Sequence, residues 1–193
     1  KNLIFKGIRP EHLSVTPVWA DPDEIQPGEK QNEFRKGLGL QDQFIVLYAG
    51  NLGQTASFSE VIGAAEQLKN NQKIHFVFVG EGVRKSELLD QVKEKQLHNV
   101  SFLPFQPREK VAEMVAASDL CLVTLNPDSS SYSLPSKTFT YMAGGRPILS
   151  VSPVNSEIAQ LMIRHDCGIN VPNGNQQRIV EVIGELSSNP ART

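Results

Sequence analysis

Residues 44–50 read FIVLYAG, a continuous run of apolar side chains that ends in a glycine. Aliphatic and aromatic residues at consecutive positions, without the alternation of a half-buried strand, are typical of a strand covered on both faces, as in a parallel sheet. The closing glycine permits backbone conformations that other residues avoid. The stretch therefore predicts a buried parallel strand that leads into a turn.

Strand-like runs recur along the chain and alternate with segments of helical period. The further runs are KIHFVFVG (73–80), VSFLPF (100–105), LCLVTL (120–125), PILSVS (147–152) and GINVP (168–172). The helical faces are Val61, Ala64, Ala65 and Leu68; Leu88, Leu89 and Val92; Val111, Met114 and Val115; Phe139, Met142 and Ala143; Ile158, Leu161 and Met162; and Ile179, Val180, Ile183 and Leu186. This alternation predicts a doubly wound α/β fold, a single Rossmann-like domain with a parallel sheet.

We expect this domain to cover residues 41–193 and residues 1–40 to form a lead-in segment that packs on it. Within the lead-in, the weaker apolar run HLSVTPV (12–18) predicts an additional edge strand. Ser57 and Glu60 have the spacing of a capping box, which predicts that a helix begins there. The chain starts at Lys1 without a methionine or a signal peptide, so we expect it to be a piece of something longer.

The composition predicts a soluble globular protein. The 193 residues are 39% hydrophobic and 21% charged. The net charge of -2 argues against a broad nucleic-acid-binding surface, so we expect no nucleic acid among the partners. No apolar run approaches the roughly 20 residues that span a bilayer. Cys121 and Cys167 form no CxxC pattern and suit a reducing, cytosolic compartment.

Ligands in doubly wound folds bind at the carboxyl ends of the strands, so the loops there are the places to search for a site. Two of them contain glycines, GNLGQT (50–55) and GEGVRK (80–85), and can bring backbone amides close to phosphate oxygens. Neither is a G-x-G-x-x-G dinucleotide fingerprint or a Walker A loop. Glycine turns also follow strands for steric reasons alone, so ligand contact and a purely structural turn both stay open.

Lys137 follows the segment SYSLPS (131–136), in the first turn of a helix that we expect to open after Pro135. A lysine there faces the positive end of the helix dipole, which costs roughly a few tenths of a kcal/mol. A bound phosphate would reverse this penalty, because it interacts favourably with the dipole, the free N–H groups and the ammonium group. The position therefore predicts an anion-binding lysine, with an ordinary solvated lysine as the alternative.

Signals for metal-dependent or nucleophilic chemistry are weak. The histidines at positions 12, 75, 98 and 165 are scattered without ligand spacing. The sequence DPD (21–23) has D-x-D spacing but lies in a proline-rich segment, where a turn is the more common explanation. The serines of 129–131 lack a G-x-S-x-G elbow, and we expect a mobile loop there. The sequence therefore assigns no catalytic residue and no metal site.

Five segments, in this order, resemble the C-terminal, donor-binding half of retaining family 4 glycosyltransferases with the GT-B fold. They are GIRPEHLSVTPVWADPDEIQP (7–27), VLYAGNLG (46–53), FVFVGEGVRKSEL (76–88), NVSFLPFQPREKVAEMVAASDLCLVTL (99–125) and PSKTFTYMAGGRPIL (135–149). The subgroup that the chain resembles is the cell-envelope and O-antigen type of sugar transferase, which often carries Pro-Ser-Lys at this place.

The resemblance implies a nucleoside-diphosphate sugar, UDP- or GDP-linked, that is bound without a metal ion or other cofactor. The sugar, of the hexosyl or N-acetylhexosaminyl type, would pass with retention of configuration to a glycan or lipid-linked acceptor. The base is expected near Phe105 and Gln106, with 80–82 lining the nucleotide side, and the diphosphate near 50–53 and 133–137. The implied donor-binding residues are Gly50, Asn51, Leu52, Gly53, Gly80, Glu81, Gly82, Phe105, Gln106, Ser133, Leu134, Pro135, Ser136, Lys137 and Thr140.

The same resemblance implies a partner and a location. An N-terminal acceptor-binding half is missing from this chain, so the chain alone is expected to be inactive. We expect a cytoplasmic protein, attached peripherally to the inner face of the membrane through the missing half.

The chain departs from the family pattern at its charged positions. Many members have Arg and Lys in the first glycine loop, where this chain has Asn51, and two glutamates around the last loop, where it has Tyr132 and Thr140. Lys137 is the residue that could supply the missing charge. Two alternatives stay open: an enzyme similar to UDP-N-acetylglucosamine 2-epimerase, and a non-catalytic nucleotide-sugar-binding module.

Overall fold

A computed structural model of the protein describes residues 2–189. It contains one sheet of six parallel strands in the order β3-β2-β1-β4-β5-β6. The strands are β1 (Phe44–Ala49), β2 (Ile74–Val79), β3 (Val100–Leu103), β4 (Leu120–Thr124), β5 (Ile148–Val151) and β6 (Gly168–Val171). Every strand-like run from residue 44 onward is therefore confirmed as a strand of a parallel sheet.

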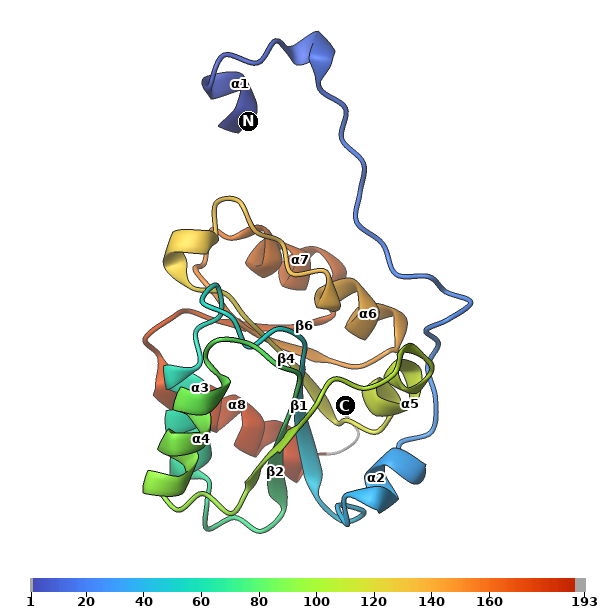
Figure 1. Ribbon diagram of the computed structural model, residues 1–193, viewed down its shortest axis with the longest axis vertical. Coiled ribbons are helices and arrows are strands. Elements are labelled where there is room, and N and C mark those ends of the chain that lie inside the picture. Colours follow the sequence, from blue (N-terminus) through green and yellow to red (C-terminus); the bar gives the residue numbers. More distant parts are fainter. Residues whose placement is uncertain (1, 190–193) are drawn as a thin grey trace.

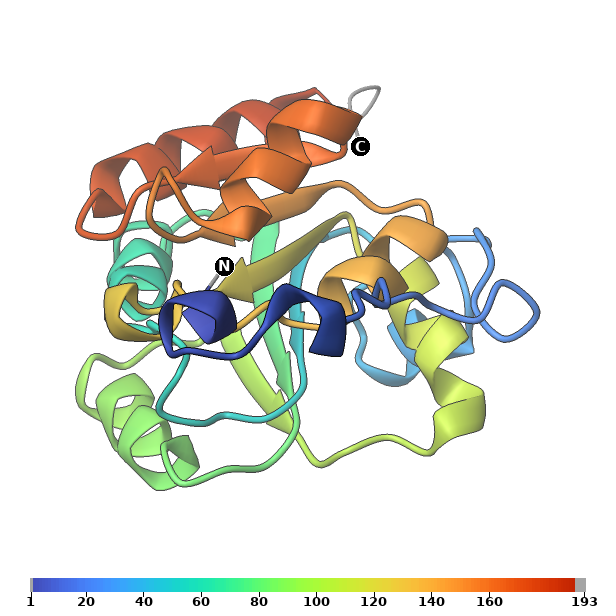
Figure 2. The ribbon, with the colours of Figure 1, turned by 90° about the horizontal axis from the view of Figure 1, so that it is seen from above.

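Helices cover both faces of this sheet (Figures 1 and 2). These helices are α2 (Glu33–Gly37), α3 (Ser59–Gln67), α4 (Lys85–Glu94), α5 (Val111–Ala116), α6 (Lys137–Ala143), α7 (Glu157–His165) and α8 (Gln176–Ser188). Helix α1 (Asn2–Phe5) lies apart from the sheet, and single 3-10 turns occur at Pro10–His12, Arg108–Lys110 and Pro127–Ser129. One core packs α3, α4 and α8 on the sheet, and the other packs α2, α5, α6 and α7. The doubly wound, Rossmann-like prediction is confirmed.

The continuous apolar run of β1 is explained by these two cores. Phe44, Val46 and Tyr48 point into one core, whereas Ile45 and Leu47 point into the other. Because successive side chains of a strand face opposite sides, a central strand has to be apolar at every position.

The lead-in segment has two parts that differ in their packing. Ile25 and Leu40 are buried, so the stretch between them lies on the domain. By contrast, Phe5 is 94% and Val15 92% exposed. Residues 2–19 extend from the domain beyond the carboxyl ends of the strands (Figures 1 and 2).

The edge strand expected at 12–18 is wrong. Residues 13–20 have no regular secondary structure, since they run away from the sheet edges that could pair with them. Pro17 also lacks the N–H group that a paired strand would use. The apolar residues of this run do not serve the core of the domain.

The capping box expected at Ser57 and Glu60 is also wrong in its details. Helix α3 begins at Ser59, and its N-cap residue Phe58 makes no side-chain capping bond. The Ser57 hydroxyl instead donates a 2.7 Å hydrogen bond to the Glu60 carboxylate, which also accepts from the amide of Gly174 at 3.0 Å. These bonds tie the start of α3 to the loop before α8, and they hold the pKa of Glu60 below its usual value although burial opposes this.

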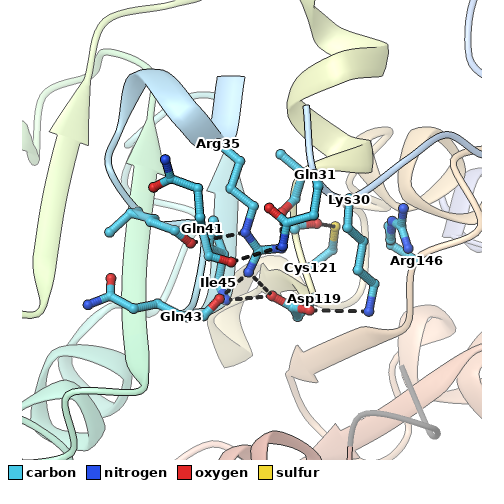
Figure 3. A network of polar contacts seen from close by, with 12 residues as sticks. Lys30, Gln31, Arg35, Gln41, Gln43, Ile45, Asp119, Cys121 and Arg146 are labelled. Carbon is cyan, nitrogen blue, oxygen red and sulfur yellow. Dashed lines mark hydrogen bonds and ion pairs between the residues drawn. The ribbon is translucent and has the colours of Figure 1, made fainter. Parts of the chain in front are cut away.

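A buried ion pair joins the lead-in to the beginning of the central strands (Figure 3). The Arg35 guanidinium, 3% exposed, donates a 2.8 Å hydrogen bond to the Asp119 carboxylate. Its other N–H groups donate to the carbonyl oxygens of Leu40, Ala117 and Gln43. The second Asp119 oxygen lies 3.1 Å from the Lys30 ammonium.

Asp119 also accepts a 2.9 Å hydrogen bond from the amide of Ile45, the second residue of β1, and it immediately precedes β4. The network therefore fixes the amino ends of the same two strands whose carboxyl ends carry the candidate site.

Among residues 2–189, no helix is long and apolar enough to cross a membrane.

Candidate functional site

A cavity lies at the carboxyl ends of β1 and β4, where the strand order reverses. In sheets of this kind the connections diverge at the reversal and leave a crevice for ligands. The cavity has a volume of about 420 Å³, within the usual range for small-molecule sites of roughly 300–1,000 Å³. Residues from the loops after β1, β3 and β4 line it.

Most residues that the sequence singled out lie around this cavity. Those in its lining are Gly50, Asn51, Phe105, Gln106, Ser133, Pro135, Ser136, Lys137 and Thr140. The segment 80–82 and the residues Leu52, Gly53 and Leu134 lie outside the lining.

The glycines of 80–82 are explained by the packing of two loops. A Cβ atom on Gly80 would lie 2.0 Å from the carbonyl oxygen of Gly50, and one on Gly82 would lie 2.4 Å from that of Leu52. The amide of Leu52 donates to the carbonyl of Glu81 at 2.8 Å. The loop after β2 thus packs against the loop after β1 and supports it. Direct ligand contact by 80–82 stays a prediction.

The other residues outside the lining also shape the loops. Leu52 is fully buried in one core, and Leu134 packs against the other. A Cβ atom on Gly53 would lie 2.9 Å from the amide nitrogen of the Asn51 side chain, so this glycine leaves room for Asn51.

Lys137 is the first residue of α6, as the sequence predicts, and its amine lies at the floor of the cavity. Its Nζ atom is 3.5 Å from the centroid of the Tyr48 ring, a cation–π contact. A Cβ atom on Gly50 would lie 2.7 Å from the same nitrogen, so only a glycine admits the amine this close to the loop.

The amine of Lys137 has no negative partner within residues 2–189: no carboxylate forms an ion pair with it. Burial lowers its pKa from 10.5 to about 7, because desolvation disfavours the charged form. An anion bound next to the amine would compensate this cost.

Two tyrosines hold the amine and the glycine loop together. The Tyr141 hydroxyl accepts a 2.9 Å hydrogen bond from the amide of Ala49 and so ties α6 to the end of β1. The Tyr48 hydroxyl donates a 2.8 Å hydrogen bond to the carbonyl of Asn51. Burial raises the pKa of both phenols, so both hydroxyls stay protonated. Position 50 and the amine of Lys137 are therefore held in a fixed relation.

Sequence reasoning missed Tyr48, Tyr141 and Thr124 in the cavity wall. The face expected for α6, which includes Phe139 and Met142, is only half-buried, whereas Tyr141 is fully buried. Tyr141 lies one helical turn after Lys137, a spacing that could have marked it. Tyr48 and Thr124 belong to continuous apolar runs, where periodicity does not distinguish a side chain that faces a cavity.

Lys137 is the one charged side chain among the described residues that line the cavity. In the part of the chain that the structure describes, no three His, Cys, Asp or Glu residues gather as metal ligands. The DPD segment (21–23) lies in an exposed turn, with the Asp23 amide bonded to the Asp21 carboxylate at 2.9 Å. The wall can therefore offer a cation, hydroxyl groups and apolar surface to a ligand.

The chain belongs to the family described as glycosyl transferases group 1, whose model matches residues 29–193. It is 29% identical over 161 residues to WcaI of Escherichia coli (strain K12), a protein named as a colanic acid biosynthesis glycosyl transferase; the match covers 82% of this chain and 39% of WcaI. It is 28% identical over 182 residues to WbjE of Pseudomonas aeruginosa, named as a glycosyltransferase, with 92% of this chain and 44% of WbjE covered. The chain thus spans less than half the length of these curated relatives.

The fold has a close counterpart in the crystal structure of Anabaena HepE in complex with UDP-glucose. The TM-score is 0.80 at 21% identity, over 98% of this chain and 52% of HepE. The expected resemblance to the glycosyltransferases and the expected Rossmann-like fold of one GT-B half are both confirmed.

Proposed function

We propose that this chain is the donor-binding half of a glycosyltransferase and that its cavity holds the diphosphate of a nucleotide sugar. The observation that carries the proposal is the amine of Lys137, which lines the cavity next to Gly50 and forms no ion pair with a carboxylate of residues 2–189, in a chain of the glycosyltransferase family. HepE, which has the same fold in one half, forms a complex with UDP-glucose. A nucleoside diphosphate would supply the negatively charged partner that the Lys137 amine lacks among residues 2–189.

The proposed pose places the base at the other end of the cavity. Phe105 is 56% exposed at the rim, next to Gln106, and offers an aromatic face for stacking. Behind it, the apolar side chains of Val111, Met114 and Val115 form the wall. The diphosphate then lies next to both Gly50 and Lys137, and the lysine supplies positive charge to it in place of a divalent metal.

The proposed reaction is transfer of the sugar, with retention of configuration, to a glycan or lipid-linked acceptor. When the bond to the sugar breaks, negative charge develops on the leaving phosphate. A preformed cation next to that phosphate lowers the energy of the transition state, because its interaction strengthens as the charge grows. Lys137 would serve this role, while the acceptor and the groups that contact it belong to a second half of the protein.

The exposed apolar residues of the lead-in support a second half over the cavity. Phe5, Val15 and Trp19 are 94%, 92% and 73% exposed, and they lie on a segment that projects beyond the carboxyl ends of the strands. Apolar groups exposed together mark surfaces that another body covers. An acceptor-binding half there would close the cleft over the donor. We also propose that the protein is cytoplasmic and attached peripherally to the inner face of the membrane through that half.

Calorimetric titration of the chain with UDP, GDP, uridine and guanosine tests the proposal. We expect one of the diphosphates to bind at least about tenfold more tightly than its nucleoside, since a charge-assisted bond is worth roughly 1.5–3 kcal/mol. EDTA and Mg²⁺ should leave this affinity unchanged. If no nucleoside diphosphate binds, the proposed function is wrong; if binding requires the metal, the metal-free mode is wrong.

A further inference from the structure

Thr124, the last residue of β4, carries a hydroxyl group with an unusual environment. The residue is 4% exposed, and its Oγ1 atom is shielded from solvent without a hydrogen-bond partner among residues 2–189. An unpaired buried hydroxyl destabilises the folded chain relative to a paired one, because its interaction with water is lost and not replaced. Native proteins rarely retain such a group without a reason, and ligand binding is one of them.

Thr124 lies in the wall of the cavity, on the same side of the sheet as Tyr48. In β1 and β4 the even-numbered residues, such as Tyr48 and Leu122, point into one core. Thr124 continues this alternation by one step beyond Leu122, at the point where the sheet opens into the cavity. The amine of Lys137 lies over the Tyr48 ring, so the side chains of Thr124 and Lys137 border the same cavity.

The register between β1 and β4 determines which residue of β1 or its following loop lies beside Thr124. The residue pairs are Val46 with Leu120 and Leu47 with Cys121. Continued in the same register, Thr124 is level with Gly50, which is the residue that the amine of Lys137 approaches. Neighbouring parallel strands are only about 4.8 Å apart, so one phosphate group can reach both residues.

We propose that Thr124 is a ligand-binding residue whose hydroxyl donates a hydrogen bond to the same diphosphate that Lys137 pairs with. The proposal rests on the proposed function and adds a binding group to it. A rotation of about 120° about χ1, from one staggered rotamer to the next, brings the hydroxyl to the place of the methyl group and the methyl group to the place of the Cβ hydrogen, which turns the donor toward the cavity. The ligand thereby supplies the partner that the hydroxyl lacks in the free protein.

Thr138 provides a matched control within the same structure. Its Oγ1 is also buried and without a partner in the described part of the chain, and the residue is 0% exposed. Unlike Thr124, it is outside the lining of the cavity. Valine at either position keeps the shape and replaces the hydroxyl by a methyl group, so both variants remove the same kind of unpaired polar group.

The test compares Thr124→Val, Thr138→Val and Thr124→Ser by thermal unfolding and by calorimetric titration with UDP. Both valine variants should raise the melting temperature of the free chain, by about 2–4 °C, because a buried unpaired hydroxyl is removed. Only Thr124→Val should weaken UDP binding, by about tenfold or more, because a hydrogen bond to a charged oxygen is lost. Thr124→Ser keeps the donor and should bind UDP within about threefold of the wild type.

Equal affinity of Thr124→Val and wild type for UDP would overturn the proposal, and so would a loss in Thr124→Ser as large as in Thr124→Val. A wild-type chain that binds neither UDP nor GDP would instead refute the proposed function, and the role of Thr124 with it. A titration with uridine separates the contacts, since the loss in Thr124→Val should disappear when the ligand has no phosphate.

Discussion

The substitution Arg35→Met is expected to lower the free energy of unfolding by about 3–5 kcal/mol, the usual cost of removing one partner from a buried ion pair. Arg35 donates hydrogen bonds to Asp119 and to three backbone carbonyl groups. Without it, the Asp119 carboxylate keeps Lys30 and the amide of Ile45 but loses its buried cation. Urea-induced unfolding, followed by circular dichroism, measures the difference.

Lys36→Met is the matched control, because it removes a cation from the next position of the same helix. Lys36 pairs with Glu33 at 2.7 Å, but both side chains are more than half exposed. An exposed pair contributes about 0–1 kcal/mol, so this variant should be nearly as stable as the wild type. Equal destabilisation by the two substitutions would show that the buried network does not anchor the lead-in.

Lys137→Met is expected to weaken UDP binding by about ten- to a hundredfold and to leave uridine binding unchanged. The selectivity follows from the position of the amine next to Gly50, where the proposed pose places the diphosphate. The methionine side chain can still pack on the Tyr48 ring, and the variant no longer has to bury the lysine's charge when no ligand is bound. The free chain should therefore be as stable as the wild type, or more stable.

Lys95→Met controls for the change in net charge. Lys95 follows α4 and pairs with Glu66 at 2.6 Å, outside the lining of the cavity. Calorimetry should give this variant the wild-type affinity for UDP. If Lys95→Met and Lys137→Met weaken UDP binding equally, the lysine acts through the overall charge of the protein and does not contact the phosphate.

The sheet could be predicted from the sequence because its strands are buried on both faces. A run such as 44–50 has no polar position, and few structures other than a central parallel strand bury every side chain of so short a segment. The ends of strands were less certain. In VSFLPF (100–105) the strand stops at Leu103, because Pro104 has no N–H group to extend the ladder.

The structure of the lead-in segment could not be predicted in the same way. The apolar residues of 12–18 resemble an edge strand in composition, but they extend away from the sheet, and composition alone does not reveal which surface covers them. The role of Arg35 was also hidden, because its partner Asp119 lies far away in the sequence and the two meet only through the fold.

The candidate site was predictable where a residue conflicts with its local structure. Lys137 stands at the beginning of a helix, an unfavourable place for a cation, and the structure puts its amine in the cavity. Thr124 and Tyr48 gave no such signal, because both fit well in a strand. Their place in the wall follows from the register between β1 and β4, which a single sequence does not contain.

The proposed function depends on an anion that contacts the amine of Lys137. Burial lowers the pKa of this amine from 10.5 to about 7 in the free chain. A bound diphosphate favours the protonated form and must raise that pKa, so the complex binds a proton that the free chain has lost above pH 7. The affinity for UDP should consequently fall as the pH rises above about 7, and it should level off beyond the pKa of the complex.

Titration of the Lys137 side chain by NMR, through the ¹³Cε resonance that is absent in Lys137→Met, measures this pKa directly. We predict a pKa of about 7 without ligand and a clearly higher pKa with saturating UDP, because the bound phosphate favours the protonated amine. A pKa that is the same with and without bound UDP would contradict the account, because it would mean that the phosphate does not lie next to the amine.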